Sequence, residues 1–353
     1  MSNNVQVAVA DARVVAAEIL ESLGAPNDVA EIVGNHLVEA DQVGHASHGL
    51  ARLPWYSRYV RDGVVRPDSV PRQITGGNSY DDAITVSADW GFSHAAAYLA
   101  TDLAVDRAKR HGTSAAAVIR CTHVGRLGAY VERAAASGCV AIATVGGMRG
   151  PGVAVPFGGS RPLLGPSPIA AAFPTTGDPV VMDFATTEVP LGKVMVAQNA
   201  GKKLAVEGLV EADGRPTDDP QALTRGGALR TFGAHKGFAL ATMSELLGGV
   251  LTGADNYRDD GPGGPSFRDA GLFLFVIAGD AFATADQVQA RASQLREAIH
   301  AVPPADGFDA VLAPGDPESR NRRDAAEHVT LPTSVWNDIQ ALLSSTSSIG
   351  AQK

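Results

Sequence analysis

The chain is poor in cysteine, in basic residues and in long apolar runs, and each shortage excludes a class of protein. Two cysteines occur among 353 residues, Cys121 and Cys139, and their spacing favours reduced, buried thiols of a cytoplasmic protein over a disulfide framework. Lys and Arg total 29 against 38 Asp and Glu, so the basic surface of a nucleic-acid binder is missing. Neither a signal peptide nor a membrane span is encoded. We therefore expect a cytoplasmic protein without nucleic-acid or membrane partners.

The glycine-rich fingerprints of nucleotide binding are missing as well. The 39 glycines nowhere form G-x-G-x-x-G or G-x-x-x-x-G-K-[ST]. This absence argues against a Rossmann domain and against a P-loop.

Hydrophobic periodicity predicts alternating helices and strands. With 45% hydrophobic and 19% charged residues, the chain has the composition of an ordinary globular protein. We predict helices over 14–23, 29–43, 93–109, 127–136, 238–251, 285–299 and 335–343, and strands over 83–87, 115–119, 140–145, 169–173, 180–184 and 272–278. The turn 175–178 favours a hairpin, whereas 146–165, 211–227 and 303–317 are expected to be loops. The predicted class is α/β with an α+β tendency and a mixed sheet.

The helix predicted over 238–251 has the most regular amphipathic pattern in the chain. Ala239, Met243, Leu246, Leu247 and Val250 fall on one side of it, and we expect that side to be buried.

The segment 44–52 concentrates polar chemistry. If the chain is helical from Ser47, His48 and Arg52 lie at positions i and i+4 on one face, where guanidinium can grip a carboxylate and imidazole can exchange a hydroxyl proton. The alternative is a helix start at which Ser47 caps and both side chains are solvated. A nucleophile elbow is excluded because position 45 is His, and a zinc site from His36, His45 and His48 lacks the H-E-x-x-H pattern. No metal is expected.

A second candidate lies where a predicted strand meets a predicted helix, at 122–128. Gly125 and Gly128 allow a ligand to approach the backbone, and a helix start favours anions. His123 is then an acid, base or substrate contact, and Arg126 a phosphate contact. The alternative is an ordinary turn with a surface histidine.

Other candidates are weaker when taken singly. Asp183 ends an apolar strand, and its alternative role is to cap a turn. His235 and Lys236 precede the amphipathic helix, where a cation and backbone N–H groups can bind a diphosphate. The alternative is an ordinary helix start with a solvated lysine. The cluster Arg320, Arg322 and Arg323 either reaches a cofactor phosphate or balances an acidic surface.

Six segments taken together resemble the type 2 malate/L-lactate dehydrogenase family. They are GHASHGLARLPWY, THVGRLGAYVERAAASG, LLGPSPIAAAFP, VMDFATTEVPLGK, AHKGFALATMSELLGGVLTG and APGDPESRNRR. The forms HVGRLG and HKGFALA look most like those of the hydroxycarboxylate dehydrogenases in that family. The resemblance covers nearly the whole chain.

The resemblance implies an oxidoreductase that uses NAD or NADP, with a non-Rossmann, largely antiparallel cofactor sheet, usually a homodimer. It implies His48 as proton donor and acceptor supported by Ser47, Arg52 as carboxylate binder, His123 as a second site histidine, and Lys193 as the family lysine. Expected cofactor contacts are Gly125, Arg126, Leu127, Gly128, Asp183, Phe184, Ala185, His235, Lys236, Arg320 and Arg323. We expect an N-terminal, substrate-side part (1–120), a cofactor part (121–300) and a C-terminal segment (301–353) that packs back on the first.

The substrate class follows from the same resemblance. We expect hydride transfer between nicotinamide and a 2-hydroxy or 2-oxo carboxylate; the alternatives are a cyclic imino-acid reductase, a ureidoglycolate dehydrogenase, or a binding protein without catalysis. Lys193 slightly favours a hydroxy acid. The family's usual T-N-P is Pro166-Ser167-Pro168 here, and Cys121-Thr122 replaces an asparagine before His123, so contacts there are expected to differ.

Overall fold

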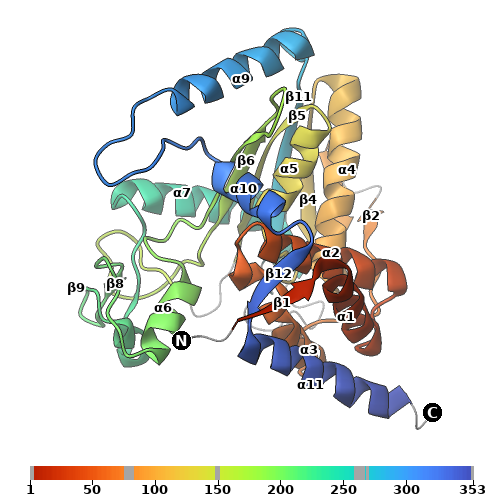
Figure 1. Ribbon diagram of the computed structural model, residues 1–353, viewed down its shortest axis with the longest axis vertical. Helices are drawn as coiled ribbons and strands as arrows, with labels where there is room; N and C mark the ends of the chain where they lie inside the picture. The colour runs from red at the N-terminus through yellow and green to blue at the C-terminus, as the bar shows by residue number, and fades with distance from the viewer. Residues whose placement is uncertain (1–3, 75–82, 148–151, 258–266, 268–269, 351–353) are drawn as a thin grey trace.

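The computed structural model describes residues 4–74, 83–147, 152–257, 267 and 270–350. Its centre is a seven-stranded sheet in the order β2 (Arg72–Ile74), β3 (Ala83–Ser87), β4 (Thr113–Ile119), β11 (Gly271–Ala278), β5 (Cys139–Gly146), β6 (Ile169–Phe173) and β7 (Val180–Phe184). Strands β3 and β4 are parallel, and the other neighbouring pairs are antiparallel. The expected mixed, largely antiparallel sheet is confirmed, as is the hairpin of β6 and β7 (Figure 1).

Two helices cover one face of this sheet. Helix α4 (Ser93–His111) lies on β4 and β11, and α5 (Gly128–Ala136) on β5 and β6. The buried side of α4 consists largely of alanine, for example Ala96, Ala100 and Ala104, each without exposed surface. Such small side chains let the helix backbone approach the strands closely.

The N-terminal helices form a second core with the C-terminal segment. Helices α1 (Val9–Ser22), α2 (Asn27–Gln42), α3 (Leu53–Arg61) and α11 (Thr333–Gly350) pack together beside a two-stranded sheet of β1 (Asn4–Ala8) and β12 (His328–Pro332) (Figure 1). The antiparallel register pairs Val7 with Val329, both buried. Neither strand was predicted. The domain boundaries expected at residues 120 and 300 stay predictions. Strands β3 and β4, which precede residue 120, lie in the central sheet, and α4 packs on it.

A third, smaller core lies around β8 (Leu209–Val210), β9 (Pro216–Thr217) and β10 (Ala228–Leu229). Helix α6 (Leu191–Asn199) and the 3-10 helix η3 (Pro220–Arg225) pack beside them. The stretch 211–227 is therefore more ordered than the expected surface loop, because it contains β9 and η3 with buried Pro220 and Ala222.

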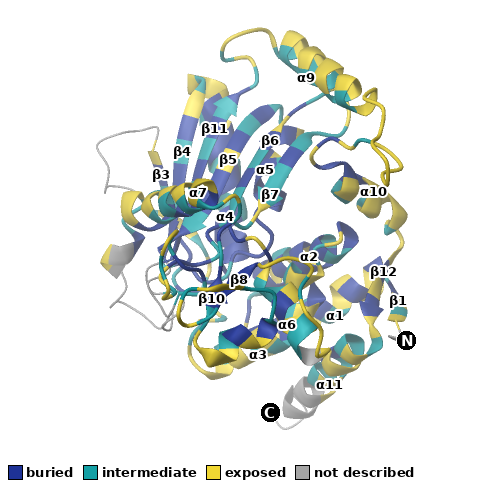
Figure 2. Cartoon of the chain, turned by 90° about the vertical axis from the view of Figure 1, so that its left-hand side faces the viewer, coloured by how far each residue is buried: buried dark blue, intermediate teal, exposed yellow. Residues whose placement is uncertain are grey.

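The largest difference from expectation concerns α7 (His235–Glu245) and its π-helical continuation η4 (Leu246–Leu251). The predicted helix exists, but Met243, Leu246 and Val250 are 51%, 46% and 51% exposed. The buried residues are instead small: Gly237, Ala241, Ser244, Gly248 and Gly249. The prediction of the buried side was wrong, because η4 lies so close to the sheet that a Cβ on Gly248 would be 2.2 Å from the Gly146 nitrogen. Figure 2 shows exposed residues along α7 beside the sheet.

The remaining elements complete the C-terminal half. They are η5 (Ala254–Tyr257), α9 (Ala285–His300) and α10 (Asp316–Asp324), of which α10 was not predicted. Within the described ranges, no helix has the length and apolarity needed to cross a bilayer.

Candidate active site

The segment 44–52 is not a continuous helix. Two 3-10 turns, η1 (Ala46–His48) and η2 (Leu50–Arg52), are separated by Gly49 with φ −89° and ψ −157°. Asp41 on α2 fixes this break, because its Oδ2 accepts the Leu50 N–H at 2.8 Å and a Cβ on Gly49 would be 2.1 Å from Oδ1. Burial raises the pKa of Asp41 to about 7. The expected helical i, i+4 geometry was wrong, since the polar residues converge through this kinked loop instead.

Arg52 folds back over the loop that precedes it. Its Nε donates to the carbonyl of Ser47 at 2.5 Å, and its guanidinium lies 4.4 Å from the centre of the Trp55 ring. Burial first, and then the charge of Arg52, lower the pKa of His48 to about 3. His48 is thus neutral beside a fixed cation.

His123 lies against His48. The two imidazole rings are parallel to within 3°, with centroids 5.4 Å apart. Burial and the neighbouring Arg52 lower the pKa of His123 well below its ordinary value. The structure therefore brings together three residues that sequence analysis placed in two separate motifs.

Behind His123 lies a buried aromatic network that sequence analysis missed. The Tyr56 hydroxyl on α3 lies 2.8 Å from His123 Nδ1 and 3.1 Å from His94 Nε2 on α4. His36 on α2 meets His94 edge-on at 4.8 Å and accepts the Arg126 N–H at 2.8 Å. One signal was available: Tyr56 follows Arg52 by four residues, as Arg52 follows His48.

Gly125 is essential to this packing. Its φ is +75°, and a Cβ there would lie 2.2 Å from His36 Nε2 and 2.8 Å from His94 Cδ2. A side chain at this position would displace the histidines, so Gly125 has a structural reason to be glycine in addition to the expected cofactor contact.

Arg126 points into the protein. Its guanidinium, 1% exposed, donates to both carboxylate oxygens of Glu132 at 2.8 and 3.0 Å and to Glu39 at 3.5 Å. Arg322 of α10 binds the same two carboxylates. These partners neutralise the Arg126 charge within the protein, and its expected phosphate contact stays a prediction.

Asp183, at the end of β7, caps α5. Its Oδ2 accepts the Gly128 N–H at 2.7 Å, and burial raises its pKa. The alternative expected for Asp183 was to cap the turn that follows β7; its carboxylate instead caps the start of α5. Leu127 is buried beside it, whereas Phe184 is 38% exposed and Ala185 partly exposed.

Lys193 and Ser47 come from different parts of the chain and lie near each other. Gly192 approaches Ser47, since a Cβ on Gly192 would be 3.6 Å from the Ser47 Cβ. Both Ser47 and Lys193 are exposed. The start of α6 therefore lies beside the histidine loop.

The start of α7 lies beside the end of β7. The Phe232 N–H donates to Thr186 O at 3.0 Å, and the rings of Phe184 and Phe232 meet edge-on at 5.5 Å. The N–H groups of residues 236–238 already bond to carbonyls of 232–234. The side chains of His235 and Lys236 at this helix start are exposed.

The two outer arginines of α10 do not meet the histidines. Arg323 pairs with Asp178 at 2.7 Å, and Arg320 is exposed. The link between α10 and the site loop is instead His45, whose Nε2 lies 3.1 Å from Glu318.

Ser167, one of the two departures from the family pattern, occupies a strained position. It is buried with φ +41°, and its Oγ donates to Glu245 at 2.9 Å. Asparagine tolerates such left-handed backbone better than serine does. The Glu245 bond supports the serine in this conformation.

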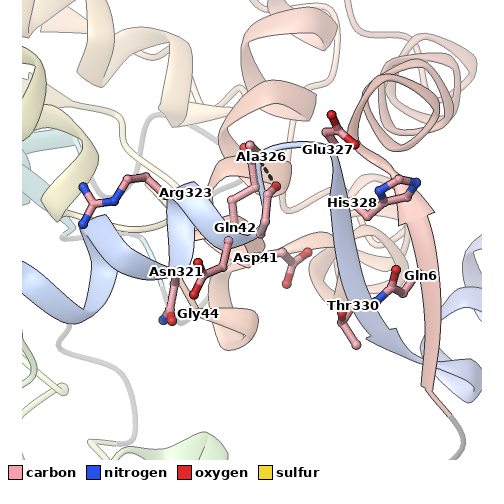
Figure 3. A pocket seen from close by; sticks show the side chains of 12 residues that line it. Gln6, Asp41, Gln42, Gly44, Asn321, Arg323, Ala326, Glu327, His328 and Thr330 are labelled. Carbon is pink, nitrogen blue, oxygen red and sulfur yellow. Dashed lines mark hydrogen bonds between the residues drawn. The ribbon is translucent and has the colours of Figure 1, made fainter.

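Of the three histidines considered for zinc, His36 bonds to Tyr98 and His45 to Glu318, whereas His48 Nδ1 has no partner among the described residues. Among the residues that the structure describes, no group of three or more His, Cys, Asp or Glu is arranged to hold a metal. A polar cavity of about 610 Å³ between α10 and β12 opens behind Asp41, with Gln42 bonded to Ala325 O at 2.9 Å (Figure 3). His48, Arg52 and His123 do not line it.

The sequence is similar to those of known dehydrogenases and reductases. The family model for malate/L-lactate dehydrogenase matches residues 7–340. The L-lactate dehydrogenase of Cupriavidus necator is 31% identical over 96% of this chain and 97% of its own. The Delta(1)-pyrroline-2-carboxylate/Delta(1)-piperideine-2-carboxylate reductase of Pseudomonas putida is 34% identical over 88% of each chain.

The fold has a close match among solved structures. The malate dehydrogenase of Entamoeba histolytica superposes with a TM-score of 0.89, covering 98% of this chain and 99% of its own at 21% identity. At that identity the match establishes the fold, and the family assignment follows from the sequence matches. The chain belongs to the malate/L-lactate dehydrogenase family.

Proposed function

We propose that this protein is an NAD- or NADP-dependent oxidoreductase that transfers hydride between nicotinamide and a 2-hydroxy or 2-oxo carboxylic acid. The observation that supports this most directly is the placing of Arg52 beside two neutral, parallel imidazoles, His48 and His123. A guanidinium recognises a carboxylate through two parallel hydrogen bonds, and an imidazole exchanges a proton with the adjacent oxygen.

Carboxylate binding changes the electrostatics of His48. Arg52 lowers the pKa of His48 in the free enzyme. A substrate carboxylate paired with Arg52 neutralises that charge, so the pKa of His48 rises as substrate binds. His48 thereby becomes a stronger base when the hydroxyl proton of a 2-hydroxy acid must be taken up, and it returns this proton to the 2-oxo oxygen in the reverse direction.

The segment from β7 to α7 fits a nicotinamide dinucleotide. Phe184, exposed and held by Phe232, offers an apolar aromatic surface, and His235 and Lys236 offer cations close by. When bound, the nicotinamide supplies the hydride acceptor or donor. We assign its contacts to Gly125, Leu127, Gly128, Asp183, Phe184, Ala185, His235 and Lys236, with Arg126, Arg320 and Arg323 as more distant candidates. Ser47 and Lys193 complete the substrate side.

The second candidate function is reduction of a cyclic imino acid. It is favoured by the 34% identity to a pyrroline- and piperideine-carboxylate reductase. In this reaction the same Arg52 would hold the ring carboxylate.

A nicotinamide absorbance assay separates these functions. Purified protein is mixed with NADH or NADPH and with pyruvate, oxaloacetate, phenylpyruvate or piperideine-2-carboxylate. Oxidation of cofactor with an oxo acid is the expected result. Turnover of the imine alone would establish the second candidate, and cofactor binding without any turnover would contradict both and favour a binding protein.

We infer that the protein is a homodimer, because the second face of the central sheet is covered only in part by α7 and η4 and carries exposed apolar side chains. Ile142 on central strand β5 is 41% exposed, and its neighbours across the sheet are Phe275 and Ala171. The exposed residues Met243 and Val250 extend this surface along α7 and η4. A second copy would cover this surface. Light scattering should give twice the chain mass, and Ile142→Asp should give a monomer; a monomeric native protein contradicts the inference.

A cytoplasmic location is part of the same proposal. Cys121 and Cys139 are both buried, free thiols, a state that persists in a reducing compartment.

A further inference from the structure

Tyr56 links two histidines through a single hydroxyl group. Its oxygen lies 2.8 Å from His123 Nδ1 and 3.1 Å from His94 Nε2. Tyr56 is 2% exposed and His94 has no exposed surface, so water has little access to this contact. The three residues come from α3, the segment before α5, and α4, and their positions are fixed by packing.

One hydroxyl proton cannot satisfy both nitrogens. If Tyr56 donates to His123 Nδ1, then His94 must donate from Nε2 to the Tyr56 oxygen. If Tyr56 donates to His94 instead, His123 must carry its proton on Nδ1. The two arrangements give His123 opposite tautomers.

The second ring nitrogen of His94, Nδ1, distinguishes the two hydrogen-bond arrangements. His94 Nδ1 is buried and has no hydrogen-bond partner among the described residues. In the second arrangement the proton of neutral His94 would lie on this nitrogen as a buried donor without an acceptor, which is rarer and costlier than a bare nitrogen. Burial lowers the pKa of His94 to about 3, so the ring carries one proton, not two. The first arrangement is therefore favoured.

We propose that Tyr56 and His94 are positioning residues that hold His123 in the tautomer protonated at Nε2, so that His123 meets the substrate oxygen as a hydrogen-bond donor and not as a base. This inference rests on the proposed function for the identity of the substrate. His123 Nε2 has no protein partner among the described residues and is not sealed from the site. Protonating His123 at Nδ1 would break the hydrogen bond that this nitrogen accepts from Tyr56.

The tautomer is measurable without substrate or cofactor. In protein labelled with ¹⁵N-histidine, a long-range ¹H–¹⁵N spectrum distinguishes a protonated ring nitrogen from a bare one, and loss of a signal set in His123→Gln assigns it. We expect bare Nδ1 and protonated Nε2 in the wild type. A proton on Nδ1 of His123 overturns the inference whatever the activity and whatever the behaviour of Tyr56→Phe.

Variants test the two positioning residues. Tyr56→Phe should release His123 into a mixture of tautomers, lower kcat about tenfold and add a second ionisation to the pH profile of kcat. His94→Gln retains a donor for Tyr56 and should keep the wild-type tautomer, whereas His94→Leu should not. Tyr59→Phe, on the same helix, is the control for the tautomer spectrum. A Tyr56→Phe enzyme with unchanged tautomer and pH profile contradicts the proposal.

The two proposals fail separately. If no oxo acid or imine is turned over but the spectrum shows Nε2–H on His123, the positioning stands and the proposed reaction falls. If oxo acids are reduced but His123 has its proton on Nδ1, the reaction stands and the positioning falls.

Discussion

His48 differs from the other buried histidines in its hydrogen bonds. His36, His94 and His123 each bond to a tyrosine hydroxyl, whereas the His48 ring makes no hydrogen bond to the described residues. The ring of His48 is therefore the one of these four that no tyrosine hydroxyl holds.

Replacing His48 by Asn should remove turnover without removing cofactor binding. Because general acid–base catalysis contributes about 100- to 10,000-fold, we expect kcat to fall by that range. Nicotinamide fluorescence titration should give an unchanged dissociation constant. A fully active His48→Asn enzyme would show that another group exchanges the proton.

Arg52 should govern carboxylate affinity. Losing a charge-assisted pair costs about 1.5–3 kcal/mol, so Arg52→Met should raise the KM for the oxo acid about 10- to 100-fold. Arg52→Lys retains the charge but not the two parallel donors, so its KM should lie between that of the wild type and that of Arg52→Met. Steady-state kinetics with an oxo acid checks this, and equal KM values in all three enzymes would refute the role.

At the scale of elements, four charged residues join three helices. Arg126, Glu132 of α5, Glu39 of α2 and Arg322 of α10 form one cluster beneath the histidine site. The cluster fixes the start of α5 relative to the helices that hold the site loop.

Breaking this cluster should destabilise the fold. Glu132→Gln leaves Arg126, 1% exposed, without its main counter-charge, and such losses cost about 3–5 kcal/mol. Arg133→Gln, next in the same helix, removes an exposed pair with Asp102 and should cost less than about 1 kcal/mol. Urea unfolding measures the free energy of unfolding of both variants. Equal losses in the two would contradict the difference expected between a buried and an exposed ion pair.

Sequence patterns predicted elements better than side-chain directions. Alternation located β4, β5, β6, β7 and β11 of the central sheet to within a few residues. It did not find β1 and β12, which pair with each other across almost the whole length of the chain. The prediction of which side of α7 is buried was wrong, because close approach of the backbones, rather than hydrophobicity, decides which side faces the sheet.

The site was only partly predicted, because sequence patterns do not show contacts between separate elements. Dense polar motifs revealed His48, Arg52 and His123, whereas Tyr56 and His94 lie in ordinary helical sequence and matter only through contacts between elements. Arg126 has the charge expected of a phosphate contact, and only the tertiary structure shows that its buried guanidinium pairs with the carboxylates of Glu39 and Glu132.

At the scale of the whole molecule, buried histidines should make the fold sensitive to acid. Burial lowers the pKa of His36, His48, His94 and His123, so below about pH 6.5 the unfolded chain binds protons that the folded chain does not, and stability falls as pH falls. Asp41 and Asp183, with raised pKa values, act in the opposite direction but are fewer.

The net effect is measurable by urea unfolding between pH 7 and pH 4. With about 1.4 kcal/mol per pH unit for each proton, we expect a net loss of about 3 kcal/mol per pH unit below pH 6. Asp41→Asn, which removes one opposing group, should steepen this loss. A stability that is flat or rises on acidification contradicts the burial of neutral histidines.

Because β1 pairs with β12, the N-terminal core can form only late in the synthesis of the chain. Val7 leaves the ribosome early but meets Val329 only when nearly the whole chain has been made. Until then the core of α1 and α2 lacks the buried side chains of β12, and those helices present apolar surface to the cell. The loop with His48 and Arg52 follows α2 directly, so we expect it to reach its final conformation only after β12 has been made.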